Sequence, residues 1–233
     1  MLTDAMATIL TAAGETGWVL EPDAKQILDL AGIPIPNFIL AATVDDAVCA
    51  AGKIGYPVAA KIVSPAVLHK TELDGVALDL KTDEALRAVF NRFKRLDRFK
   101  GVLVEEMVAG VELIVGAKID YQFGPVVLLG IGGTGVELYG DTAVRMAPLN
   151  DQDVRSMVHQ LKGRRVLEGF RGSKPVDMKS LGDLVVRFSK LIMDLETQIT
   201  SIDLNPVMCT SEGCVVADAR IMLVENPSRH GTA

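Results

Sequence analysis

Apolar positions in the first part of the chain switch between a helical period of about 3.6 and a strand period of about 2. After Thr82, apolar side chains follow at i, i+3, i+4 and i+7, which predicts a helix with Thr82 as its N-cap. Similar patterns predict helices at 21–31 and from Thr43 to Gly55, strands at 36–41, 57–63 and 75–80, and a polar loop at 64–75. Gly32 and Pro34 end the first of these helices.

Strand-like segments follow one another closely in the second part. They are predicted at 101–108, 110–119, 124–131, 142–149, 199–208 and 214–222, with helices over 151–161 and after Asp177. Such close succession favours a mainly antiparallel sheet, so the fold class is α+β. The change of pattern places a subdomain break near residue 101. The helix after Asp177 has a buried stripe that runs from Met178 to Leu195.

Composition narrows the function classes. The 233 residues are 49% hydrophobic and 23% charged, which is typical of a globular protein of one or two domains. The net charge of −6 and the lack of a Lys/Arg run argue against nucleic-acid binding. No signal peptide and no apolar run of roughly 20 residues is present, so no membrane span is expected. The odd number of cysteines, three, favours reduced thiols in a cytoplasmic protein.

Two residues in the first part have candidate chemistry. Lys61 interrupts the apolar strand PVAAKIV, where a cation is costly if buried. It is either an edge-strand lysine that reaches solvent or a lysine that contacts phosphate. His69 lies in the loop LHKTELDG, in which Gly75 permits a close backbone approach. Its imidazole is either a surface group or an acid, base or nucleophile.

The segment VLVEEMVAGVELIVG suggests a nucleotide hinge. One of the adjacent residues Glu105 and Glu106 must face inward on a strand. The segment is either a hairpin with one solvated carboxylate, or a hinge in which backbone groups of 105–108 pair with adenine and Glu112 reaches the ribose hydroxyls.

GIGGTG at 130–135 satisfies the dinucleotide-binding pattern but lacks its context. No helix pattern follows it, and the acidic residue expected about 20 positions later is missing, so a Rossmann site is rejected. Gly132 and Gly133 can still offer backbone N–H groups to an anion. Arg171, between two glycines, is either a phosphate clamp or part of a turn.

The last two strands contain a candidate cation site. Asp203 and Asn205 are two positions apart and therefore share one face, and Asp218 lies within VVADARI. If these strands pair, Asn205 and Asp218 converge on one hard cation, for which Mg²⁺ is suited. The alternative is a turn-capping Asn-Pro pair with an isolated carboxylate.

These motifs in this order resemble the ATP-grasp β subunit of ADP-forming acyl-CoA synthetases, which are relatives of succinyl-CoA synthetase. The resemblance covers nearly the whole chain. It is carried by YPVAAKIVSP with LHKT, VEEMV with GVELIVG, FGPVVLLGIGG, R-x-AP, and IDLNPVM with DARI. It implies one ATP-grasp domain over 1–233 with two subdomains and the nucleotide between them. The smaller subdomain spans 24–101, and the larger one comprises 102–226 together with 1–23.

The resemblance also implies roles for individual residues. Lys61 and Arg145 would contact phosphate, His69 would accept a phosphoryl group, and Asn205 and Asp218 would bind Mg²⁺. The nucleotide, ATP or ADP, would be held by Glu105, Glu106, Met107, Val108 and Glu112, with Gly132 and Gly133 as further candidates.

The implied reaction is acyl-CoA + ADP + phosphate ⇌ carboxylate + CoA + ATP, through a phosphohistidine relay. No segment remains for the CoA-binding α portion of the family, so the chain is expected to work with a CoA-binding α subunit, as α₂β₂. Two alternatives stay open. One is a stand-alone ATP-grasp carboxylate–amine ligase, which needs no histidine at position 69. The other is a non-catalytic nucleotide-binding subunit, against which the presence of Lys61, His69, Asn205 and Asp218 argues.

Overall fold

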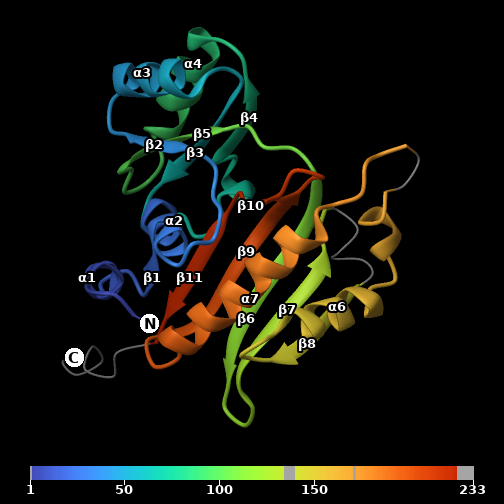
Figure 1. Cartoon of the computed structure of the whole chain (residues 1–233). Helices are drawn as coiled ribbons and strands as arrows, with labels where there is room; N and C mark the ends of the chain where they lie inside the picture. Colours follow the sequence, from blue (N-terminus) through green and yellow to red (C-terminus); the bar gives the residue numbers. More distant parts are fainter. Residues whose placement is uncertain (1, 134–139, 170–171, 225–233) are drawn as a thin grey trace, which may run out of the picture. The chain divides into compact units, whose positions relative to one another are not determined.

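The computed structural model describes residues 2–133, 140–169 and 172–224. The chain divides into two compact units (Figure 1). The larger unit comprises Met1–Val19, Asp23–Pro34 and Ala109–Ala233, and the smaller one Leu20–Pro22 and Ile35–Val108. The chain therefore leaves the smaller unit after Val108 rather than near residue 101.

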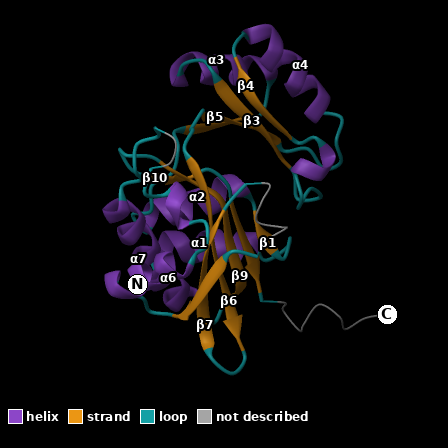
Figure 2. Ribbon diagram, turned by 90° about the vertical axis from the view of Figure 1, so that its right-hand side faces the viewer, coloured by secondary structure: helices purple, strands orange, loops and turns teal. Residues whose placement is uncertain are grey.

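The smaller unit contains a four-stranded antiparallel sheet in the order β2-β5-β3-β4. Its elements are β2 (Phe38–Ala41), α3 (Val44–Ile54), β3 (Val58–Val63), the short 3-10 helix η1 (Thr71–Leu73), β4 (Val76–Leu80), α4 (Asp83–Phe93) and β5 (Gly101–Glu106). The predicted caps Thr43 and Thr82 accept hydrogen bonds from backbone N–H groups of α3 and α4. Both helices lie together on one side of the sheet, as Figure 2 shows, and bury Leu86, Phe90 and Phe93 of α4.

The larger unit contains a seven-stranded antiparallel sheet in the order β1-β11-β9-β6-β7-β8, with β10 paired to β9. Its strands are β1 (Trp18–Val19), β6 (Val111–Asp120), β7 (Gly124–Ile131), β8 (Thr142–Met146), β9 (Ile199–Cys209), β10 (Cys214–Val216) and β11 (Ala219–Leu223). Its helices are α1 (Asp4–Ala13), most of α2 (Glu21–Leu30), α6 (Asp151–Gln160), the short η2 (Arg164–Val166) and α7 (Met178–Leu195). The predicted antiparallel sheet is confirmed.

Helix α7 packs on β6, β7, β9 and β10, and α6 packs on β8 and α7. Asp177 caps α7 as predicted, and its apolar stripe from Leu181 to Leu195 is buried. Met178 is the exception, because its side chain remains 39% exposed.

Two sequence predictions need correction. The strand expected over 214–222 is interrupted at Ala217 and Asp218, which separate β10 from β11. Helix α1 and strand β1 were not predicted. In the described ranges, no helix is both long and apolar enough to cross a membrane.

Candidate functional site

Lys61 lies at the centre of the small sheet. Strand β3, which carries it, is hydrogen-bonded to β4 on one side and β5 on the other. The Lys61 side chain is only 6% exposed, and its Nζ lies 2.7 Å from Glu21 Oε1 and 3.0 Å from Glu105 Oε2. The edge-strand interpretation is therefore wrong, and the buried ammonium is compensated by two carboxylates.

Lys70 joins the same group. Its Nζ lies 2.8 Å from Glu21 Oε2, and the side chains of Lys70 and Glu21 are 11% and 3% exposed. We call these four residues, Glu21, Lys61, Lys70 and Glu105, the Lys–Glu cluster. All four belong to the smaller unit, and their formal charges balance.

His69 precedes Lys70 in the polar loop. Its side chain is 55% exposed, and Nδ1 lies 3.9 Å from Glu72 Oε1, too far for a hydrogen bond. The predicted close approach at Gly75 is confirmed. A Cβ there would lie 2.7 Å from Ile62 Cγ2 and 2.9 Å from the Lys70 carbonyl oxygen, so the loop needs glycine. The imidazole is thus solvent-accessible while the base of its loop is closely packed.

The hinge candidates lie at the end of β5. As predicted, one of the paired glutamates faces inward: Glu105 is buried and Glu106 is exposed. Glu106 accepts a hydrogen bond of 2.9 Å from Asn37 Nδ2, and its backbone N–H donates to the Asn37 carbonyl. Met107 Sδ accepts from the Asp79 N–H. The roles of residues 105–108 toward adenine stay predictions.

Glu112 and the glycine loop lie together in the larger unit. The Gly132 N–H donates to the Glu112 carbonyl over 2.6 Å, and a Cβ on Gly132 would lie 2.7 Å from the Glu112 carbonyl carbon. Gly133 has a φ of +83°, and Glu112 Oε2 lies 3.4 Å from where its Cβ would be. Strands β7 and β8 are antiparallel neighbours, so the rejection of a Rossmann site is confirmed. Thr134, Gly135, Glu137 and Arg171 lie outside the described residues.

Arg145 lies on the helix-covered face of the large sheet. It is in register with Val127 and, across β6, with buried Ile202. Its guanidinium donates to Ser156 Oγ over 3.1 Å and to Gln160 Oε1 over 3.4 Å, both on α6. The structure therefore does not bring Arg145 to the face that carries Asp203 and Asn205, and its phosphate contact stays a prediction.

Asn205 and Asp218 are adjacent. The Asn205 N–H donates to the Asp218 carbonyl over 3.1 Å, as β9 and β11 pair. Asp203 and Asn205 alternate with the buried Ile202 and Leu204, so their side chains point away from α7. Asp203 Oδ2 forms an ion pair of 2.8 Å with Arg220 Nη2. The interruption at Ala217 and Asp218 thus lies beside the backbone contact between Asn205 and Asp218, and their role toward a cation stays a prediction.

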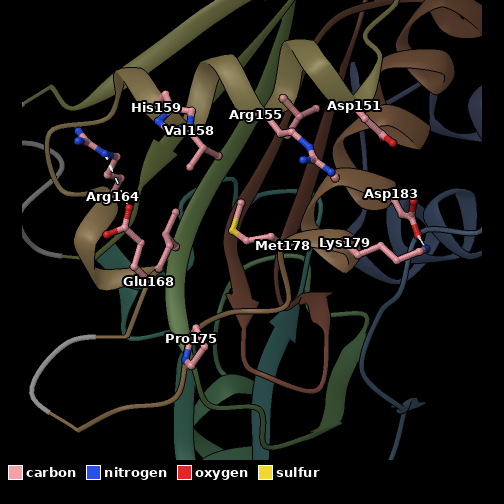
Figure 3. A pocket seen from close by; sticks show the side chains of 13 residues that line it. Asp151, Arg155, Val158, His159, Arg164, Glu168, Pro175, Met178, Lys179 and Asp183 are labelled. Carbon is pink, nitrogen blue, oxygen red and sulfur yellow. Dashed lines mark hydrogen bonds and ion pairs between the residues drawn. The ribbon is translucent and has the colours of Figure 1, made fainter.

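A cavity of about 420 Å³ lies elsewhere in the larger unit. Figure 3 shows that side chains of α6, among them Arg155 and His159, and of the start of α7, including Met178, line it. Lys179 at its rim pairs with Asp183 over 2.6 Å. None of the residues predicted for nucleotide or metal binding lines this cavity.

Comparison with known proteins identifies the family. A family model described as an ATP-grasp domain matches residues 11–223. The chain belongs to the ATP-grasp family. This confirms the fold class and the resemblance predicted from the motifs.

Individual relatives agree with this assignment. The chain is 39% identical over 227 residues to the Acetate–CoA ligase [ADP-forming] I subunit beta of Pyrococcus furiosus, covering 94% of this chain and 97% of that subunit. The crystal structure of PH1788 from Pyrococcus horikoshii superposes with a TM-score of 0.89 at 34% identity, covering 97% of this chain and all of that one.

A third relative has been solved with ligands. It is the dinucleotide forming acetyl-coenzyme A synthetase 1 of Ca. Korarchaeum cryptofilum in complex with coenzyme A and Mg-AMPPCP, its phosphohistidine segment pointing towards the nucleotide binding site. It has a TM-score of 0.82 and 38% identity, and the match covers 94% of this chain and all of that chain.

Sequence reasoning missed part of the site. It included Glu21 only within the helix predicted at 21–31, gave Lys70 no role, and assigned Glu105 to nucleotide binding through its backbone. The available signal was the apolar strand around Lys61, because a buried lysine requires an acidic partner. The alternation in VLVEE identified one inward glutamate, but nothing local indicated Glu21, 40 positions before Lys61.

Proposed function

We propose that this chain is the nucleotide-binding β subunit of an ADP-forming acyl-CoA synthetase, which catalyses acyl-CoA + ADP + phosphate ⇌ carboxylate + CoA + ATP. The observation that carries the proposal is the 39% identity along nearly the whole of a subunit with this activity in its name. The presence of His69 favours this enzyme over a stand-alone carboxylate–amine ligase.

Asn205 and Asp218 fit a divalent cation. Their backbones are directly hydrogen-bonded, and both side chains offer oxygen, the donor that Mg²⁺ prefers. Among the described residues, no group of three or more His, Cys, Asp or Glu is placed to hold a metal. A cation on this pair would take its remaining ligands from water and phosphate, and would supply charge neutralisation at the phosphates.

The other residues would bind and orient the nucleotide. Backbone groups of Glu105 to Val108 would pair with adenine, and Glu112 would accept hydrogen bonds from ribose hydroxyls. Of the two candidate glycines, Gly133 would offer its N–H to phosphate, because the Gly132 N–H already donates to the Glu112 carbonyl. Lys61 would stabilise charge on the transferring oxygens, because the two carboxylates keep its side chain charged and hold it in place. Arg145 is retained as a candidate phosphate contact.

His69 would carry the phosphoryl group. A neutral ring nitrogen attacks the phosphorus of an acyl phosphate, and the P–O bond to the carboxylate breaks. A terminal oxygen of ADP then attacks the phosphohistidine, the P–N bond breaks, and ATP forms. Protonation of His69 removes the attacking lone pair. The exposure of the imidazole supports this role, because a phosphoryl donor and an acceptor must each reach it.

The acyl and CoA sites would belong to a CoA-binding α subunit in an α₂β₂ assembly. The name of the Pyrococcus furiosus relative, a β subunit, supports the existence of such a partner. The proposal includes a cytoplasmic location, predicted from the few cysteines of the sequence.

Incubation of the purified chain with γ-labelled ATP and Mg²⁺ tests the proposal, because the reverse half-reaction phosphorylates His69 without the partner. The wild type should take up label that is stable to base and released by acid, and His69→Ala should take up none. A wild-type chain that stays unlabelled, or a His69→Ala variant that labels equally, contradicts the relay.

A further inference from the structure

Asp141, directly before β8 in the larger unit, has a carboxylate whose two oxygens each accept a hydrogen bond from a backbone N–H group. Oδ1 accepts from the Lys162 N–H and Oδ2 from the Gly163 N–H, each over 2.7 Å. Lys162 and Gly163 belong to the turn between α6 and η2, more than 20 positions further along the chain. The carboxylate therefore fixes the start of β8 to that turn. None of the roles proposed above uses Asp141.

The Asp141 backbone connects the same point to the end of β7. Its carbonyl accepts from the Ile131 N–H over 3.3 Å, and Gly133, the proposed phosphate contact, follows two residues after Ile131. On the other side of β7, the Gly132 N–H donates to the Glu112 carbonyl over 2.6 Å. The chain that leads to Gly133 is therefore held from both sides, by Glu112 of β6 and by Asp141.

Two glycines allow the close packing around Asp141. A Cβ on Gly130 would lie 3.0 Å from the Asp141 carbonyl oxygen. A Cβ on Gly163 would lie 3.1 Å from Asp141 Oδ2 and 3.2 Å from Ile131 Cγ1. Non-bonded carbon atoms prefer a separation of about 3.5–4.0 Å, so a methyl group at either position would displace these neighbours. Asp141 and Ile131 thus pack against the same turn, and a shift of one affects the other.

We propose that Asp141 is a positioning residue that holds Gly133 where its N–H group meets a phosphate of the nucleotide. The inference rests on the proposed function, in which Gly133 contacts phosphate. Asp141 acts through the backbone of Ile131 and does not itself contact the ligand. A backbone N–H that is held in place before the ligand arrives needs no ordering when phosphate binds. Loss of the Asp141 carboxylate should therefore weaken the binding of nucleotides through their phosphates.

Three variants weaken this contact to different degrees. Asp141→Ala removes both hydrogen bonds, and Asp141→Asn removes one, because an amide has a single acceptor oxygen. Gly163→Ala disturbs the contact from the other partner, since its methyl group would displace Asp141 Oδ2.

Asp120→Ala is the matched control. Asp120 Oδ1 also accepts from two backbone N–H groups, those of Gln122 and Phe123, over 2.8 and 3.0 Å. Asp120 is in register with Gly124 at the start of β7, so this carboxylate lies at the opposite end of the strand from Ile131.

Isothermal titration calorimetry with ADP and with adenosine, both in the presence of Mg²⁺, measures the contribution of phosphate separately from that of the nucleoside. Asp141→Ala should weaken ADP binding by about tenfold, and Asp141→Asn and Gly163→Ala by about threefold. None of the three should change the affinity for adenosine, which has no phosphate. Asp120→Ala should bind both ligands as the wild type does.

Thermal unfolding of the same variants separates positioning from general stability. A merely structural role of Asp141 would lower the melting temperature and weaken the binding of ADP and adenosine alike, and that result overturns the inference. Wild-type affinity for ADP in Asp141→Ala overturns it as well. If Asp141→Ala does not fold, Asp141→Asn decides by the same two criteria.

The inference and the proposed function fail in different ways. A wild-type chain that binds ADP but is not labelled at His69 contradicts the relay, and the comparison of ADP with adenosine still decides the role of Asp141. A wild-type chain that binds no ADP overturns both.

Discussion

The two units hold their candidate residues in opposite ways. In the smaller unit, Lys61 is enclosed by Glu21 and Glu105, and its charge is balanced inside the protein. In the larger unit, Asn205 is exposed, and the neighbouring Asp203–Arg220 pair is 44% and 30% exposed. The first arrangement fixes a charge before any ligand arrives, and the second places the Asn205 side chain in solvent. Substitutions should therefore change fold and activity together in the first, and activity alone in the second.

Asp218→Ala should have the largest effect. Loss of the carboxylate removes one of the two proposed protein ligands of the cation, and we expect Mg²⁺-dependent labelling of His69 to fall by roughly a thousandfold. The circular-dichroism spectrum should stay that of the wild type. Glu212→Ala, which removes an exposed carboxylate from the β9–β10 turn, is the control and should label normally. An Mg²⁺ dependence unchanged in Asp218→Ala would remove this residue from the site.

Lys61→Met tests the difference between the two units through its effect on the free energy of unfolding. It leaves two carboxylates buried without their shared cation, so we expect the free energy of unfolding of the smaller unit to fall by about 3 kcal/mol. Asn205→Ala, at an exposed position, should change that free energy by less than about 0.5 kcal/mol while it lowers Mg²⁺ affinity.

Urea unfolding followed by circular dichroism measures both variants. The fluorescence of Trp18, the single tryptophan, reports the larger unit separately. Equal midpoints for Lys61→Met and the wild type would show that the buried cluster contributes nothing to the fold of the smaller unit.

Substitution of Tyr56, which also lies in the smaller unit, should have the smallest effect of these changes, and the effect should be on the pH dependence of stability. Burial, together with the hydrogen bond of 2.8 Å that its hydroxyl donates to Asp83 Oδ1, raises the pKa of Tyr56 to about 12. The folded protein therefore holds this proton more tightly than the unfolded chain does. Its contribution to stability is fully present below the unfolded pKa of about 10 and is lost as pH rises from there toward 12.

Ultraviolet titration and urea unfolding between pH 9 and pH 12, from about one unit below the unfolded value up to the folded value, measure this effect. Tyr56→Phe should flatten the pH dependence of stability in that range. A wild-type slope in the variant would assign the effect to other groups.

The features predicted correctly from the sequence are those that a few neighbouring residues determine. Caps such as Thr82 and Asp177, the inward Glu105 and the need for glycine at position 75 all follow from the few residues around each position. The adjacency of Asn205 and Asp218 also followed, because a short connection constrains which strands pair.

Long-range placement was the part that local patterns could not predict. That β3 is central rather than at an edge depends on β5, which inserts between β2 and β3 from more than 35 residues away. For the same reason the partner of Lys61 at Glu21 was missed. The side-chain direction of Arg145 depends on sheet register, which composition does not reveal.

The order in which the candidate residues occur along the chain has a consequence for synthesis. Residues 35–108 form a continuous stretch of the smaller unit, whereas the large sheet needs β9 and β11, which come last. A nascent chain on the ribosome can therefore fold the part with Lys61 and His69 while Asn205 and Asp218 are still untranslated. On the proposed function, an unfinished or C-terminally degraded polypeptide lacks the cation ligands, and so cannot consume cellular ATP.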